Sequence, residues 1–202
     1  RFKFTAAQWL IIRASVIGVI LLIGITIAFI AYLETNQKKN SLELLRTIRT
    51  AKKQQVEAFY QSLRNDAYVF STLDVVTFGL KGFSQEFYQG GINSKEYRQI
   101  DSVYRLKLDA LLRDERYEDL YLVTNRGDVV FSVQQQEDFG TNIAKGAYKN
   151  QMIQRAFSAG KTETSLTDLS NYKLVGNKLP MGFAASPIFD ENGVRLGVLI
   201  IL

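Results

Sequence analysis

Few residues in this chain could do chemistry. Its 202 residues include no cysteine and no histidine, which excludes disulfides, thiolate chemistry, histidine-based metal sites and histidine-dependent triads. Asp138 and Asp168 have no catalytic partner at a recognisable spacing, and the nearby Gly140 and Gly146 form no phosphate loop. We therefore predict that these residues are not an enzyme, and we expect no cofactor and no metal ion.

A binding site is the stronger prediction. Aromatic residues gather in the second half of the chain, and Asp168 lies four residues before one of them. Apolar walls with one carboxylate would suit a small ligand that carries an amine. The alternative is that the aromatics are ordinary core and that Asp168 caps a turn. The predicted site residues are Tyr121, Phe131, Tyr148, Asp168, Tyr172 and Phe183.

The elements that must position these residues are strands. Residues 120–124 and 129–133 read as two strands around a tight turn, and residues 181–189 and 194–202 as two more. Asp190 to Gly193 resembles part of a calcium loop but lacks its later bidentate glutamate, so a hairpin turn is favoured. Between these two pairs of strands lie a short helix over 148–157, which ends by Gly160, and a possible strand over 162–167. The pattern predicts an α+β fold with an antiparallel sheet.

A long helical pattern precedes the sheet. After a polar joint at 34–40, Ser41 is a reasonable N-cap, and the pattern ends at Gly90 and Gly91. A second helix follows, in which Asn93 and Glu96 have capping-box spacing. The apolar positions of the first pattern are mostly three or four residues apart and include Leu42, Leu45, Ile48, Val56, Phe59, Leu63, Ala67, Phe70, Leu73, Val76, Leu80, Phe83 and Phe87.

An apolar segment opens the chain. Ala14 to Tyr32 is nineteen residues without a charge, and as a helix it would rise about 28 Å, close to the thickness of bilayer hydrocarbon. Trp9 and Tyr32 flank it, where aromatic rings favour the membrane interface. A cleaved signal fits poorly, because residues 28–31 are a poor cleavage site, and a buried core helix would carry a polar face. We predict a membrane anchor.

The charge is concentrated beside this anchor. The net charge of +5 divides into +3 over residues 1–13, +4 over 34–55 and −2 over the remainder. A basic juxtamembrane region suits lipid headgroups and argues against a nucleic-acid-binding domain. The basic flank before the anchor favours an N-terminus in the cytoplasm, although the basic cluster at 34–55 favours the opposite orientation. We expect residues after about Asn36 to lie outside the cytoplasm.

The sheet half resembles the Cache family of extracytoplasmic sensor domains, which have a PAS-like fold with a long N-terminal helix packed on a sheet. The matching stretches are LYLVTNRGDVVFSV at 120–133, DFGTN at 138–142, GAY at 146–148, Asp168 with Tyr172, FAASPIF at 183–189 and GVL at 197–199. Upstream, residues 53–60 and 75–87 look like the family's first helix. No single motif is diagnostic; their order and spacing carry the likeness.

The resemblance implies a bacterial receptor with an anchor helix, a periplasmic or extracellular sensor, a second membrane helix and a cytoplasmic output module such as a cyclase, kinase or chemoreceptor domain. Ligands in such a family are amino acids, amines or small carboxylates, and Asp168 falls where an acidic ligand contact is often placed. The Arg/Trp/Tyr set of the amino-acid-binding subgroup is missing, which leaves the ligand class open.

These observations predict a sensor of small molecules in a bacterial inner membrane. The expected organisation is an anchor over 1–35, a helical region over 36–115 and a PAS-like domain over 116–202. Since the chain starts at Arg1 and stops in an apolar run, we expect the native protein to be longer. We also predict a parallel homodimer through the helix from Leu42 to Leu73, part of whose apolar stripe must cover the sheet. The alternative is a membrane-anchored structural or assembly subunit.

Overall fold

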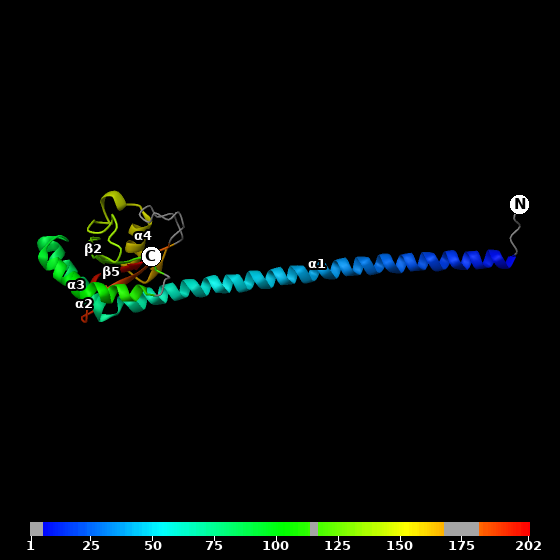
Figure 1. Ribbon diagram of the computed structural model, residues 1–202, viewed down its shortest axis with the longest axis horizontal. Helices are drawn as coiled ribbons and strands as arrows, with labels where there is room; N and C mark the ends of the chain where they lie inside the picture. Colours follow the sequence, from blue (N-terminus) through cyan, green and yellow to red (C-terminus); the bar gives the residue numbers. More distant parts are fainter. Residues whose placement is uncertain (1–5, 114–116, 168–181) are drawn as a thin grey trace. The chain divides into compact units, whose positions relative to one another are not determined.

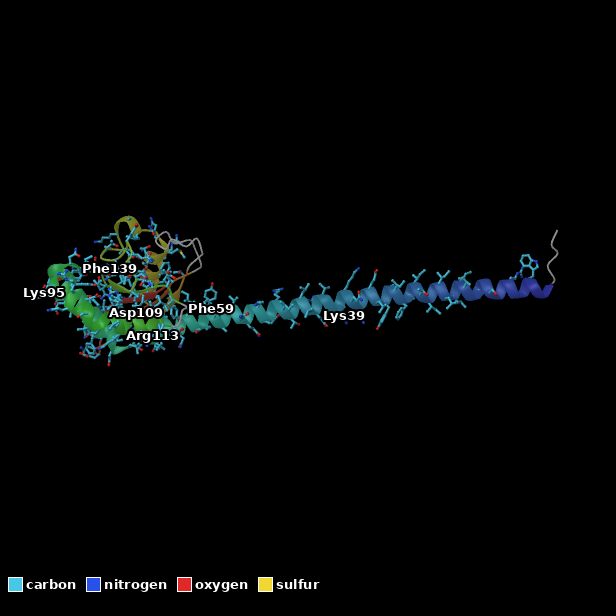
Figure 2. The ribbon with its side chains drawn as sticks, viewed as in Figure 1. Lys39, Phe59, Lys95, Asp109, Arg113 and Phe139 are labelled. Carbon is cyan, nitrogen blue, oxygen red and sulfur yellow. The ribbon has the colours of Figure 1, made fainter. Side chains whose placement is uncertain are left out.

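The computed structural model describes residues 6–113, 117–167 and 182–202 (Figure 1). The chain divides into two units, residues 1–57 and residues 58–202. Helix α1, Ala6–Ser71, supplies the described part of the first unit and opens the second. The second unit contains the remaining helices and all the described strands.

In the first unit, α1 is the one helix of the described residues that is long and apolar enough to cross a membrane. Its apolar side chains, such as Leu22 and Ile25, are exposed, unlike those of a core helix. The predicted joint at 34–40 and the N-cap at Ser41 are wrong, because α1 runs through both without a break. The joint contains no glycine or proline, and its glutamine, lysine and glutamate residues are good helix formers.

The second unit begins with the end of α1 and a break that the apolar spacing did not predict. The helix stops at Ser71, and α2 spans Asp74–Gly90. Leu73, between them, has an extended backbone with φ −74° and ψ 137°. At the far end of α2, Gly91 has a φ of 75°, and its N–H donates to the carbonyl of Phe87 (3.1 Å). This end agrees with the predicted stop.

Helix α3 spans Lys95–Asp109 and runs into a short 3₁₀ turn, η1, at Ala110–Leu112. Its N-cap is Ser94 rather than the predicted Asn93. The Ser94 hydroxyl accepts the N–H of Tyr97 at 3.0 Å, which satisfies a backbone donor that the first turn leaves without a partner. The prediction chose the wrong one of two adjacent polar residues.

The sheet has five antiparallel strands in the order β2-β1-β5-β4-β3. They are β1 (Leu120–Thr124), β2 (Val129–Ser132), β3 (Ser165–Leu166), β4 (Ala184–Phe189) and β5 (Arg195–Ile201). The described part of the chain therefore confirms the predicted α+β class and the antiparallel sheet. The turn between β4 and β5 is a hairpin turn, in which Asp190 Oδ1 accepts the N–H groups of Asn192 and Val194.

Each face of the sheet has its own core. One face, here called the helix face, packs against α2, α3 and residues 63–73, with Leu80, Phe83, Tyr97 and Phe131 fully or almost fully buried. The other, the α4 face, is covered by α4 (Met152–Gly160) and by the chain before it, including the 3₁₀ turn η2 (Gly146–Tyr148). Figure 1 shows α2 and α3 on one side of the strands and α4 on the other.

Helix α4 lies later in the chain than predicted, over 152–160 instead of 148–157. It reaches the sheet through Gly160, where a Cβ would lie 2.7 Å from the Cβ of Ala185 and 2.8 Å from Cγ1 of Val198. A larger residue at this position would push the helix off strands β4 and β5. The helix end is thus fixed tightly on the middle of the sheet.

A candidate ligand-binding face of the sheet

The structure places three of the predicted site residues on the α4 face. Tyr121 in β1 and Phe183, just before β4, are buried in its core, and Tyr148 in η2 packs against the same core while partly exposed. Tyr121 and Phe183 come to one face from β1 and from the residue that leads into β4, because side chains alternate across extended backbone. The sequence predicted these residue types together, and the sheet register shows how they meet.

Phe131 lies on the helix face. Its ring centroid is 4.9 Å from that of Phe83, and the guanidinium carbon of Arg105 lies 5.0 Å from the centre of its ring. Its strand partner is Leu122, which belongs to the same core. The sequence-based grouping of Phe131 with Tyr121 did not account for the register, so we leave Phe131 out of the candidate site.

Asp168 and Tyr172 lie outside the described residues. Thr167 and Phe183, which the structure does describe, bond to each other. The N–H of Thr167 donates to the carbonyl of Phe183 (2.8 Å), and the N–H of Phe183 donates to Oγ1 of Thr167 (2.9 Å). These bonds extend the β3–β4 pairing to Thr167 and Phe183.

A row of residues crosses the α4 face from β1 to β3. Tyr121 pairs with Ile200, Ile200 with Ala185, and Ala185 with Ser165. Within the described part of the chain, the Ser165 hydroxyl oxygen is buried and has no hydrogen-bond partner. Burying a hydroxyl without a partner costs folding free energy. The row thus has a polar group at each end, the Tyr121 phenol and the Ser165 hydroxyl, and the apolar side chains of Ile200 and Ala185 between them.

Asp138 is a buried carboxylate beside this face that the site prediction omitted. It is fully buried, and its backbone carbonyl accepts from the N–H (3.1 Å) and the hydroxyl (2.7 Å) of Thr141. Burial raises the pKa of Tyr148, and the negative charges of Asp138 and Glu137 raise it further. The carboxylate of Asp138 is thus within electrostatic reach of the Tyr148 phenol. The DFGTN stretch was the sequence signal that could have identified Asp138.

A second buried carboxylate holds the ends of strands together. Asp119 accepts from the hydroxyl of Ser132 (2.8 Å) and from the N–H groups of Leu120 (2.7 Å), Val133 (2.9 Å) and Gln134 (3.2 Å). Burial raises the pKa of Asp119, and these four hydrogen bonds offset only part of the effect. Since all the bonds of the carboxylate are to the start of β1 and to residues 132–134 at the end of β2, we interpret Asp119 as structural.

The β1–β2 turn carries a third acidic group. Burial raises the pKa of Asp128, but hydrogen bonds from Tyr88, Asn142 and Thr124 outweigh it, so the pKa is lowered overall. Tyr88 comes from the end of α2, and Asn142 comes from the loop over the α4 face. Asp128 thus ties the two sides of the sheet together.

The described residues contain no group of three acidic side chains close enough to hold a metal ion. On or beside the α4 face lie aromatic and aliphatic side chains, a phenol, a hydroxyl and a buried carboxylate. Such a mixture favours a small polar molecule with an apolar part.

No family model and no curated protein matches the chain. Among solved structures, the sensor domain of the Vibrio cholerae histidine kinase DctB matches with a TM-score of 0.52 and 14% identity. The match covers 74% of this chain and 50% of that domain. The chain has the fold of a histidine-kinase sensor domain. It spans half the length of the domain that it matches, and the likeness concerns the fold alone.

Two further matches have lower scores. An extracellular ligand-binding receptor from Desulfohalobium retbaense has a TM-score of 0.41 at 14% identity, over 73% of this chain and 23% of that one. The periplasmic domain of Vibrio cholerae LuxQ also has a TM-score of 0.41, at 10% identity, over 70% of this chain and 55% of that one.

Proposed function

We propose that this chain is the sensor part of a membrane-anchored bacterial receptor, and that it binds a small molecule on the α4 face of its sheet. The observation that carries the proposal is the difference between the faces. Three helical segments fill the helix face with apolar side chains, whereas Tyr121, Tyr148, Asp138 and Ser165 bring polar groups to or beside the α4 face. The sensor-domain fold supports this role.

The proposed ligand carries an amine, as an amino acid or a simple amine does, with small carboxylates as the competing class. Asp168 would supply the charged contact, because a partly desolvated carboxylate needs a cation or several donors, and no basic residue follows it before Lys173. Tyr121, Tyr148, Tyr172 and Phe183 would form the walls. The signal would pass to an output module elsewhere in the receptor.

A thermal-shift screen of the chain in detergent with amino acids, amines and small carboxylates tests the proposal. A ligand should raise the melting temperature, and Asp168→Asn should weaken its binding by about 1–3 kcal/mol, the scale of a charged hydrogen bond. Phe131→Leu, on the other face, is the control and should bind normally. The proposal fails if the ligand binds equally well to Asp168→Asn and to a Tyr121→Ala variant that remains folded.

The proposed location is the bacterial inner membrane, with residues after about Asn36 in the periplasm or outside the cell. The apolar part of α1 would be the anchor, and Lys38 and Lys39, just beyond it, would lie near anionic lipid headgroups. A cysteine in the β4–β5 turn can report the side. Asp190 holds that turn through two hydrogen bonds, so the exposed Glu191 is the better position. If an impermeant thiol reagent labels Glu191→Cys only after lysis, the orientation is wrong.

A parallel homodimer through α1 remains part of the proposal, with a shorter helix–helix contact than the apolar spacing from Leu42 to Leu73 predicted. Leu63, Phe70 and Leu73 pack in the core of the helix face and are not available to a partner. Leu42 and Leu45 are 57% and 61% exposed, which leaves them free for a helix–helix contact. Leu45→Lys should therefore shift the chain toward monomer in sedimentation, and a wild-type chain that is itself monomeric would exclude the dimer.

A further inference from the structure

Three hydroxyl groups form a chain through the interior of the second unit. Ser186 lies in β4 on the helix face and is fully buried. Its Oγ lies 2.9 Å from Oγ of Ser71, the last residue of α1, and 2.8 Å from Oγ1 of Thr164, the residue before β3. Ser71 Oγ in turn donates to the carbonyl of Tyr68 at 2.8 Å. This hydroxyl chain joins the edge of the sheet to the end of α1.

The direction of every bond in this chain follows from counting hydrogens. A serine or threonine hydroxyl has one hydrogen to donate. The hydrogen of Ser71 is used on the Tyr68 carbonyl, so Ser71 must accept from Ser186. The hydrogen of Ser186 is then used as well, so Ser186 must accept from Thr164. The order is Thr164 to Ser186 to Ser71 to the Tyr68 carbonyl.

The last acceptor lies where α1 ends. Carbonyls in the final turn of a helix lack partners four residues ahead. Here the N–H of Thr72 donates to Val69 at 3.1 Å, and the hydroxyls of Ser71 and Thr72 cap the carbonyls of Tyr68 and Val69. The hydroxyl chain therefore helps to fix the break between α1 and α2, which no glycine or proline explains.

The first donor lies where the α4 face meets the sheet edge. Thr164 follows α4 by four residues, and β3 after it has only two residues. The carbonyl of Lys161, just past α4, accepts from Nη1 of Arg195 (2.7 Å). Because Thr164 follows α4 so closely, a shift of that helix would reach Thr164 along the backbone, and the bond to Ser186 holds Thr164 to the helix side of the sheet.

We propose that the chain Thr164–Ser186–Ser71 is the physical coupling between the α4 face and the end of α1. Hydrogen bonds in a row polarise one another, so loss of the first donor weakens the bonds after it. That ligand binding is transmitted through this coupling rests on the proposed sensor function. The existence of the coupling does not depend on that function, and it can be tested without a ligand.

The test is hydrogen exchange of the full chain in detergent, followed in peptides that cover residues 66–73. Thr164→Val keeps the shape of the side chain and removes the donor. We expect exchange of the last turn of α1 to become roughly three- to ten-fold faster, the effect of weakening one hydrogen bond. Thr167→Val is the matched control, because it lies on the same edge but has no bond to Ser186; it should leave these amides unchanged.

A second measurement distinguishes coupling through the three hydroxyl groups from a general loosening of the sheet edge. In a Ser71→Ala background, Thr164→Val should add no further acceleration, because the path ends at Ser71. Independent sites would instead give multiplied effects. The coupling is overturned if Thr164→Val leaves residues 66–73 unchanged, if Thr167→Val accelerates them equally, or if the two substitutions multiply. Failure of the ligand screen with a positive exchange result would remove the sensor proposal and leave the coupling intact.

Discussion

The two faces of the sheet use the same strands for different purposes. On the helix face, Phe83 contacts the rings of Tyr97 and Phe131, with centroids 5.4 Å and 4.9 Å away, and the Tyr97 hydroxyl donates to the carbonyl of Val130 at 2.6 Å. Burial raises the pKa of Tyr97, which keeps that phenol protonated. This face is an apolar core whose polar atoms bond within it.

The α4 face has a nine-residue helix and loops as its cover, and it keeps polar groups inside or at its margin, among them the Ser165 hydroxyl and the Asp138 carboxylate. Burial of an aromatic residue therefore does not by itself identify a site. Phe131 and Tyr121 are equally buried and both lie in the sheet, and only the neighbours of each distinguish core from candidate site.

The largest expected effect is on the helix face. Phe83→Ala would leave a cavity between rings that cannot close in around it, so we expect the free energy of unfolding to fall by about 3–5 kcal/mol, measured by denaturant titration. Tyr121→Phe, which removes only a hydroxyl from the α4 face, should change it much less and should alter ligand response instead. Equal losses of stability for both variants would contradict the division of roles.

The next effect concerns Asp119, which joins the strand ends. Asp119→Ala would leave the N–H groups of Leu120, Val133 and Gln134 without their acceptor, and we expect a loss of about 3 kcal/mol in the free energy of unfolding. Asp119→Asn keeps an acceptor oxygen and is the control; it should cost less than half as much. A loss of the same size in both variants would show that the charge, and not the hydrogen bonding, matters.

The raised pKa of Asp119 also predicts a dependence on pH. A carboxyl whose pKa is higher in the folded state binds its proton more tightly there, so folding is favoured below the unfolded pKa of about 3.9. This contribution is lost as the pH rises from there through the folded pKa. Asp119→Asn should remove that decline from the plot of unfolding free energy against pH. A wild-type curve with the opposite contribution from Asp119 would mean that its hydrogen bonds outweigh burial.

The smallest effect tests the link between the faces at Asp128. Tyr88→Phe removes a 2.6 Å hydrogen bond to a carboxylate that is partly exposed, so we expect a loss of about 0.5 kcal/mol at neutral pH. Because the Tyr88 bond is one of those that lower the pKa of Asp128, the variant should lose less stability as the pH falls below about 3.9. Denaturant titrations at pH 7 and pH 3 give both values, and an unchanged acid response would exclude this role for Tyr88.

The sequence alone determined the features that depend on local pattern. The apolar segment from Ala14 to Tyr32, the β4–β5 hairpin turn at Asp190 and the end of α2 at Gly91 follow from composition, turn chemistry and backbone preference, and the structure agrees on the helix and both turns. These signals reside in a few neighbouring residues. Periodicity of three and four also placed Leu80 and Phe83 on one apolar helix face, and the structure buries both of them against the sheet.

Tertiary structure decided what depends on contacts between distant residues. The break after Ser71 is held by Ser186, which is 115 residues away along the chain, so no local pattern could show it. The separation of Phe131 from Tyr121 depends on sheet register, because a shift of one residue moves a side chain to the opposite face. Asp119 and Asp138 are ordinary acidic residues in the sequence, and only the folded chain surrounds them with donors or buries them.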